Sequence, residues 1–275
     1  MQHGDTIRVA SPSEGEAAAK VEGRYLYCVA DSGEKVSLGP IGIDGHEVYT
    51  IPYKDICAVV HDCAAEPYQS SDAEVVKGWV RAHQRVVDRA WEKWGTVLPL
   101  GFDTIVRDQG GSDSRESVET WLATDYQSLK RKMEAVRGKA EYGVQVFWDA
   151  RTIAKSIAET SATMGRLEDE IRSKPRGLAY IYRLKLENAL KREMEAKADQ
   201  CFRDFYKRIK KHVCDLRVEK TKRTGHDSRM IMNLSCLVDR DKSTELGEEL
   251  ESIDKIEGFS VRFTGPWPPY SFVST

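Results

Sequence analysis

The longest amphipathic pattern in the chain runs from about Arg176 to Leu216, with no Pro or Gly after Gly177. In its second half, apolar residues recur every three or four positions, as they do on one face of an α-helix. This face comprises Ala198, Phe202, Phe205, Ile209, His212 and Leu216, and the positions between are mostly charged. At about 1.5 Å of rise per residue, the pattern predicts a helix roughly 60 Å long. Part of this helix should cover a sheet, and part should project or pair with a neighbouring helix.

The first half of the chain alternates strand patterns with two amphipathic helices. Segments rich in β-formers predict strands over residues 24–30, 47–51 and 56–61. One helix is expected from Ser71 or Asp72 to about Trp94, and another from Ser114 to Arg137. Between the two helices, residues 96–106 form two extended pieces around a turn that contains Pro99 and Gly101.

The second half of the chain repeats a strand–helix order with a long helical insertion. It predicts strands over residues 141–148, 229–238 and 259–264, a possible short strand at 217–220, and helices over 151–171, 176–216 and 241–253. The order β, interrupted α, β, β, α, β is that of a ferredoxin-like split βαβ fold, with a four-stranded antiparallel sheet and helices on one face.

The sequence therefore predicts an α+β protein of two domains, which suits a length of 275 residues. Residues 1–22 should be a disordered tail, 23–138 a small N-terminal α+β domain, and 139–264 the ferredoxin-like domain. The long helix 176–216 would form an extended helical hairpin or a coiled-coil-like projection. Residues 265–275 hold three prolines, which disfavour a helix or a central strand, so this segment should be a stiff Pro/aromatic arm lying against the protein.

Composition gives no global attraction to nucleic acid or to a lipid membrane. Charged residues make up 31% of the chain, but the formal net charge is only -2. No apolar run approaches the roughly 20 residues that a membrane span needs, and residues 1–22 lack the apolar segment of a signal peptide. The six Cys residues lie mostly in apolar patterns and are interpreted as reduced core residues. A cytoplasmic protein is expected.

No motif in the chain predicts catalysis, a cofactor or a metal. Cys57, His61 and Cys63 are close in sequence, but Cys57 and His61 would lie about 13 Å apart along a strand. His61 and Cys63 alone supply too few ligands. His83 lies in the apolar stripe of its helix, where a buried, hydrogen-bonded His is expected. An alternative hypothesis remains an enzyme or a haem- or ligand-binding protein on the ferredoxin-like scaffold, with His61, His83 or His212 as base or axial ligand.

The end of the long helix is locally basic. Its cations are Arg203, Lys207, Arg208, Lys210, Lys211, Arg217, Lys220, Lys222 and Arg223. A solvated surface explains them most simply, and an acidic protein partner is a second interpretation. An RNA-binding module is a further alternative, but the central strands lack the exposed aromatic pattern that stacks bases.

Several motifs together resemble the gas vesicle protein F/L family. They are YLYCVA, the GIDG turn, CAVV, AHQRVVDRAW, VLPLGFDTIV, GVQVFWD and FTGPWPPYSFV, which together extend over roughly residues 24–273. The last is the most specific. The resemblance implies Arg and Gly near the positions of Gly101 and Asp103, where this chain differs.

The resemblance implies a non-enzymatic accessory protein of gas vesicle formation that binds the major shell protein, associates with the vesicle and assists assembly, without nucleic acid or lipid. Other accessory proteins are further candidate partners. The turn 99–104 is expected to be exposed because Pro99 and Gly101 interrupt regular pairing. We predict an interaction surface formed by Leu98, Pro99, Leu100, Phe102, Thr104 and Trp267. The nearby Trp79, Trp91 and Trp94 are interpreted as core, with an exposed binding patch as the alternative.

Overall fold

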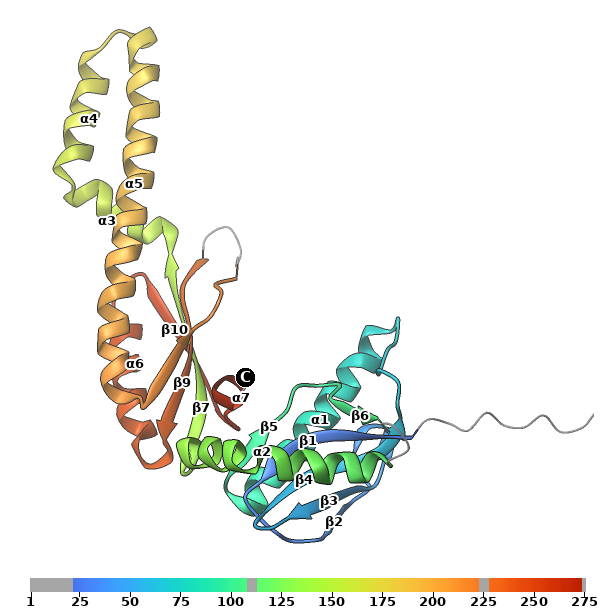
Figure 1. Ribbon diagram of the computed structural model, residues 1–275. Coiled ribbons are helices and arrows are strands. Elements are labelled where there is room, and N and C mark those ends of the chain that lie inside the picture. The colour runs from blue at the N-terminus through green and yellow to red at the C-terminus, as the bar shows by residue number, and fades with distance from the viewer. Residues whose placement is uncertain (1–21, 108–112, 223–227, 274–275) are drawn as a thin grey trace, which may run out of the picture.

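The computed structural model describes residues 22–107, 113–222 and 228–273. It consists of two sheets with their covering helices, and a helical hairpin that projects from the second sheet (Figure 1). The tail predicted over residues 1–22 lies outside the described residues except for Glu22, which begins the first strand.

The first sheet is antiparallel and is built around β1 (Glu22–Ala30), which pairs with three other strands. The other strands are β2 (Ser37–Gly39), β3 (Val48–Tyr53), β4 (Ile56–Ala64), β5 (Val97–Pro99) and β6 (Ile105–Arg107). Their order is β2-β3-β4-β1-β5, and β6 also pairs with β1. β1 pairs with β4 along one edge and with β5 and β6 along the other, so its residues 25–30 are fully enclosed.

Two helices cover the two faces of this sheet, at the positions that the sequence predicted. α1 (Ala73–Trp94) packs Val86 and Val87 with Tyr25 and Tyr27 of β1. α2 (Ser114–Val136) packs with the side chains that β1 directs to the opposite face, among them Leu26. Both helices begin at an Asp side chain that accepts a backbone N–H of the first turn, Asp72 from Glu74 and Asp113 from Arg115.

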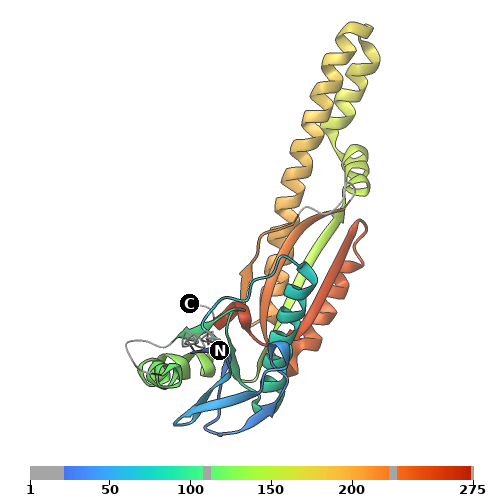
Figure 2. The same ribbon diagram turned by 90° about the vertical axis from the view of Figure 1, so that its right-hand side faces the viewer.

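The second sheet is also antiparallel, with the strand order β10-β7-β9-β8. Its strands are β7 (Lys139–Asp149), β8 (Asp215–Val218), β9 (Ser228–Asp239) and β10 (Phe259–Trp267). α5 (Arg176–Ile209) and α6 (Ser243–Asp254) bury one face in a single cluster that contains Phe205, Ile209 and Leu250. The upper half of α5 rises beyond this sheet (Figure 2).

The long helix is shorter than predicted, because α5 ends at Ile209 rather than Leu216. A short 3-10 turn over Lys210–His212 follows, and Val213 is extended. Leu216 belongs to β8, opposite Cys236 of β9. The helical spacing of apolar residues continues to Leu216, but residues 215–218 form a strand because their backbone makes hydrogen bonds with β9. Local periodicity does not reveal this pairing.

The helix predicted over 151–171 is two helices, α3 (Ala150–Thr160) and α4 (Ala162–Ser173). Ser161 interrupts them with an extended backbone (φ -82°, ψ 120°), and its hydroxyl oxygen accepts the N–H groups of Thr163 and Met164. The same hydroxyl donates to Glu193 of α5 at 2.7 Å. This bend turns α4 alongside α5 and forms the projecting hairpin (Figure 1).

The expected Pro/aromatic arm, residues 265–275, has regular structure as far as it is described. β10 continues through the cis peptide between Gly265 and Pro266 to Trp267, and α7 (Tyr270–Val273) follows. Proline fits in β10 because it is an edge strand, and Pro268 and Pro269 precede the helix, where their missing N–H groups cost little. Tyr270 and Phe272 then pack against the cores of the first sheet.

Side chains from both halves join the two sheets. Trp91 of α1 packs against the cores of both, and the guanidinium of Arg240 lies 4.1 Å from its ring centroid. Arg240 also donates to the carbonyl oxygen of Gly95 at 2.9 Å. Leu237 of β9 packs in the same cluster as α2. The three Trp residues of α1, Trp79, Trp91 and Trp94, are thus half-buried core residues, as expected.

Candidate functional site

The turn that follows β5 is tied to β1 at both ends. Leu98 lies opposite Val29 in the sheet and is only 2% exposed. The Leu100 N–H donates to the carbonyl oxygen of Tyr27 at 3.0 Å, and the Leu26 N–H donates to that of Thr104 at 2.8 Å. The turn is therefore held closely against β1.

A buried network of tyrosine and histidine side chains supports the turn from below. We call Tyr25, Tyr27, His61, Tyr68 and His83 the Tyr–His network. His83 Nε2 lies 3.2 Å from the carbonyl oxygen of Leu100, which can only accept, so Nε2 carries the proton. His83 Nδ1 then accepts the hydroxyl of Tyr25 at 2.9 Å, and the Tyr25 oxygen accepts the Asp103 N–H at 2.9 Å.

The other half of the Tyr–His network reaches the turn through Tyr68. The Tyr27 hydroxyl lies 2.7 Å from His61 Nδ1, and His61 Nε2 lies 3.0 Å from the Tyr68 hydroxyl. The Tyr68 N–H donates to the Asp103 carboxylate at 3.0 Å. Asp103 has a left-handed backbone (φ 68°), which costs a non-glycine residue conformational energy. Its two hydrogen bonds fix this conformation.

Burial keeps every member of the network uncharged at neutral pH. It lowers the pKa of His83 to about 4 and that of His61 to about 3. It raises the pKa values of Tyr25, Tyr27 and Tyr68 well above the usual value for tyrosine. Because both nitrogens of each His have protein partners, neither ring offers a free position to a metal or a substrate.

Beside the turn lies a groove of about 420 Å³ between β5, α2 and the C-terminal α7. We call it the β5–α2 groove. Its lining residues are Val29, Leu98, Pro99, Leu100, Gly101, Trp121, Asp125, Ser128, Leu129, Lys132 and Val273. Lys132 Nζ donates to the carbonyl oxygen of Val273 at 3.2 Å and so fixes α7 at its edge. The groove is lined by apolar and polar groups in comparable amounts, and Asp125 and Lys132 provide its charges.

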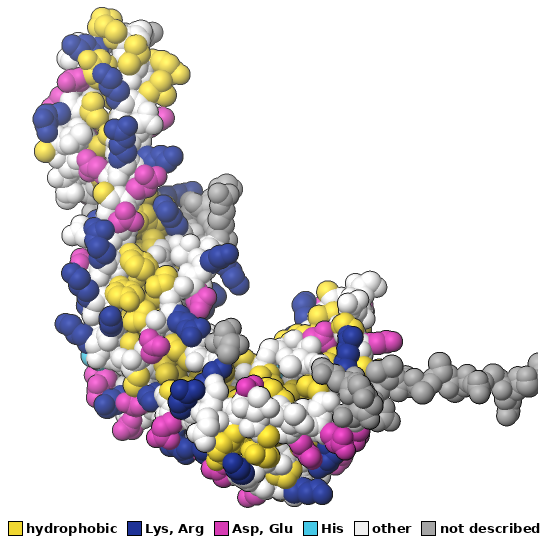
Figure 3. Space-filling view, in the orientation of Figure 1, with side chains coloured by type: hydrophobic (Ala, Val, Ile, Leu, Met, Phe, Trp, Pro, Cys, Tyr) yellow, Lys and Arg dark blue, Asp and Glu magenta, His cyan; other side chains and the backbone are white. Residues whose placement is uncertain are grey.

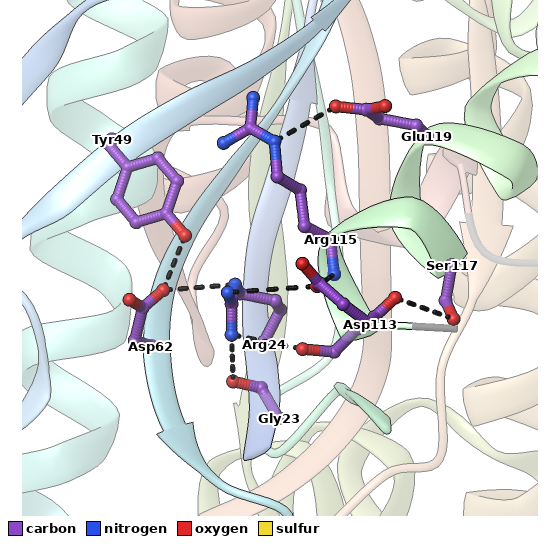
Figure 4. A network of polar contacts seen from close by, with 9 residues as sticks. Gly23, Arg24, Tyr49, Asp62, Asp113, Arg115, Ser117 and Glu119 are labelled. Atoms are coloured by element: carbon purple, nitrogen blue, oxygen red, sulfur yellow. Dashed lines mark hydrogen bonds and ion pairs between the residues drawn. The ribbon is translucent and has the colours of Figure 1, made fainter. Parts of the chain in front are cut away.

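Arg24 positions α2, the helix that forms one wall of this groove (Figure 4). Its guanidinium donates to Ser114 Oγ at 3.0 Å and lies 3.1 Å from the carboxylate of Asp62 on β4. Asp113, the N-cap of α2, lies 3.9 Å from the same group. Ser114 is fully buried, so Arg24 ties the first turn of α2 directly to β1 and β4.

The structure brings together only part of the predicted interaction surface. Leu98, Pro99 and Leu100 line the groove, whereas Phe102, Thr104 and Trp267 do not. The expected exposure of the turn 99–104 is wrong for Pro99, which is buried because β5 is paired with β1. Leu98, which precedes the turn, is buried for the same reason.

Phe102 is half-buried rather than exposed. Its ring centroid lies 6.3 Å from that of Tyr25 and 6.1 Å from that of His83, on the side of the Tyr–His network. Trp267 is 44% exposed on the edge strand β10. Sequence reasoning missed Trp121 and Lys132, although Trp121 lies outside the inward stripe of α2 and so signals a second apolar surface.

The structure bears on the alternative functions as well. Where the chain is described, no group of three His, Cys, Asp or Glu side chains is placed to hold a metal ion. None of the described helices is both long and apolar enough to cross a membrane. On the central strands β7 and β9, the described aromatic side chains Tyr142, Phe147 and Trp148 are buried, so they offer no surface for stacking bases.

Comparison with known proteins identifies the family. A family model described as gas vesicle synthesis protein GvpL/GvpF matches residues 23–274. Gas vesicle protein L1 of Halobacterium salinarum is 32% identical over 275 residues, covering 95% of this chain and 96% of that protein. Gas vesicle protein F1 of the same organism is 23% identical over 256 residues, covering 92% and 93%.

The fold is likewise shared with a solved structure. The crystal structure of GvpF from Anabaena sp. PCC7120 matches with a TM-score of 0.73 at 20% identity, covering 92% of this chain and 99% of that chain. The match therefore extends over both sheets and the hairpin of this mixed α and β fold. The chain belongs to the GvpL/GvpF family of gas vesicle synthesis proteins.

Proposed function

We propose that this protein is a non-enzymatic accessory protein of gas vesicle formation that binds the major shell protein through the β5–α2 groove and assists its assembly. Membership in the GvpL/GvpF family supports the role in gas vesicle formation. The observation that supports the binding assignment is the groove itself, a hollow of about 420 Å³ on a firmly held turn, in which apolar side chains lie beside a few polar and charged groups.

The physical requirement on the partner matches this groove. A wall that encloses gas excludes water, so its subunits need a strongly apolar surface, and they would aggregate through it before assembly. The groove offers Leu100 and Trp121 to an apolar segment of a subunit, while Asp125 and Lys132 orient that segment by charge. Because the Tyr–His network and Arg24 hold its walls, little ordering entropy is lost on binding.

We further propose a division of labour between two units. The N-terminal unit, residues 22–136, carries the groove. The second is a ferredoxin-like unit, an assignment that its strand order β10-β7-β9-β8 supports. Its hairpin would recruit further accessory proteins at the vesicle in the cytoplasm. The identity to gas vesicle protein L1, 32% against 23% for F1, supports the L branch of the family.

The test is co-purification of the tagged protein with the major shell protein. Leu100→Ser/Trp121→Ser removes two half-buried groove side chains and should reduce the recovered shell protein by about tenfold or more, as loss of a central apolar anchor does. Trp267→Ser is the matched control, since Trp267 is exposed outside the groove and its removal should leave recovery unchanged. Far-UV circular dichroism and unfolding midpoints establish that both variants are folded.

Two outcomes would contradict the proposal. Recovery that depends on Trp267 and not on the groove residues would move the interface to the edge of the second sheet. If the wild-type protein fails to recover the shell protein, the proposed binding is wrong, although family membership remains.

A further inference from the structure

A second surface of distinct chemistry lies on the lower half of α5, far in sequence from the β5–α2 groove. A hollow of about 580 Å³ is lined by Phe202, Arg203, Tyr206, Lys207, Lys210 and Lys211. We call it the α5 groove. Figure 3 shows hydrophobic side chains along this part of α5, flanked by Lys and Arg. The inner face of the same helix, with Phe205 and Ile209, is already buried in the second sheet's core.

The floor of the α5 groove is aromatic. Phe202 and Tyr206 are half-buried, and their ring planes are inclined by 24° with centroids 6.0 Å apart. Both pack against the core beneath, so their positions are fixed. The aliphatic stems of the Lys and Arg side chains extend this apolar surface, while their charged ends form its rim.

The charges of the α5 groove are all positive. Arg203, Lys207, Lys210 and Lys211 are exposed, and no carboxylate is among the lining residues. Within the described parts of the chain, none of these four cations has a carboxylate at salt-bridge distance. The nearby acids of α6 face elsewhere, since Glu249 lies 2.5 Å from Arg208 and 3.6 Å from His212. Lys210 Nζ lies 5.9 Å from the ring centroid of Tyr206, at the edge of the aromatic floor. In a chain with a formal net charge of -2, four neighbouring cations without a carboxylate partner are a local excess of positive charge.

We propose that the α5 groove binds an acidic amphipathic helix of a partner protein. Apolar side chains of that helix would cover Phe202 and Tyr206, and its carboxylates would face the four cations at the rim. The groove extends from residue 202 to residue 211, roughly 14 Å along the end of α5 and the 3-10 turn that follows it, which accommodates two to three turns of a partner helix. This proposal does not depend on the proposed function.

The observations favour a protein over a single-stranded nucleic acid. A nucleic acid needs ring faces that are free to stack on its bases. Here Phe202 and Tyr206 are half-buried and lie roughly parallel to each other, so they form a floor for aliphatic groups instead. Charge complementarity with the four cations then selects carboxylates on the partner.

The experiment uses the full chain and a labelled synthetic helix of about 20 residues, with Leu at helical spacing and Glu elsewhere. Binding is followed by fluorescence anisotropy. Lys207→Glu/Lys211→Glu should lower the affinity for this peptide by about tenfold or more. Lys191→Glu/Lys197→Glu is the matched control, because it makes the same charge change at exposed positions of the same helix and should bind like the wild type. A peptide with Leu replaced by Ser should also bind about tenfold more weakly.

Three results would overturn the inference. An equal loss of affinity in both double variants would mean that the peptide is attracted by charge in general. If the Ser peptide binds as tightly as the Leu peptide, the aromatic floor plays no part. Tighter binding of a uridine oligonucleotide, lost in Lys207→Glu/Lys211→Glu, would assign the groove to nucleic acid. Each result leaves recovery of the shell protein unaffected, since that readout depends on the other groove.

Discussion

Lowering the pH from 6.5 towards 4 is expected to destabilise the folded protein by roughly 3 kcal/mol through His83 alone. Burial lowers the pKa of His83 from 6.5 to about 4 in the folded protein. Between these values the unfolded chain binds the proton and the folded protein does not, so the free energy of unfolding falls as the pH falls. The full contribution is present above pH 6.5, and no further loss occurs below the folded pKa.

His61 acts in the same direction over a wider range, because burial lowers its pKa to about 3. The two effects are not additive, since both rings are joined through the neighbouring Tyr25 and Tyr27. Protonation of His83 at Nδ1 removes the acceptor of the Tyr25 hydroxyl, whereas the Nε2–H bond to the Leu100 carbonyl oxygen is retained. The turn after β5 should therefore loosen first at Asp103, whose N–H donates to the same Tyr25 oxygen. A lower protection factor of the Asp103 N–H on acidification, relative to the intrinsic exchange rate at each pH, would report this loosening.

Urea unfolding at a series of pH values between 7 and about 4 measures the effect. His83→Gln retains a polar side chain but cannot take up a proton, so its stability should vary less with pH than that of the wild type. His212→Gln, at the end of α5, is the control and should keep the acid dependence. If His83→Gln loses as much stability on acidification as the wild type, the burial of His83 is not its cause.

Arg24→Ala is expected to lower the free energy of unfolding by about 2–3 kcal/mol. The substitution removes the donor to the fully buried Ser114 hydroxyl and the ion pair with Asp62. It also removes the aliphatic stem that packs beneath the start of α2. The expected loss of stability is smaller than for a fully buried ion pair, because the Asp62 side chain is 66% exposed and is hydrated in the variant.

Arg115→Ala is a matched control for this prediction (Figure 4). The Arg115–Glu119 pair is 3.1 Å long, but both side chains are more than one-third exposed, so its loss should change stability by less than about 0.5 kcal/mol. Urea unfolding compares the two variants, and hydrogen exchange in the first turn of α2 locates the damage. Equal stability of the two variants would mean that Arg24 does not anchor α2.

The sequence by itself determined the elements whose signals are local. Asp72, one of the two expected caps, caps α1, and α2 begins at Ser114 as predicted. Alternation in residues 229–238 predicts β9. The apolar stripe of α1 also places His83 in the core. Each of these features depends on residues within one or two turns or along one strand, so neighbours in the sequence suffice to specify it.

The tertiary structure alone decided the features that depend on distant partners. α5 ends at Ile209 because β8 pairs with β9, and β10 continues to Trp267 because it is an edge strand. Phe102 is half-buried because Tyr25 and His83 hold the turn from below, an arrangement that joins segments far apart in the chain. The β5–α2 groove likewise forms between elements that are distant in the sequence. The α5 groove depends on which part of α5 stays exposed, and the periodicity of the sequence does not specify this. A pattern fixes which face of an element is apolar, but only the packing of remote elements fixes which apolar surface remains uncovered.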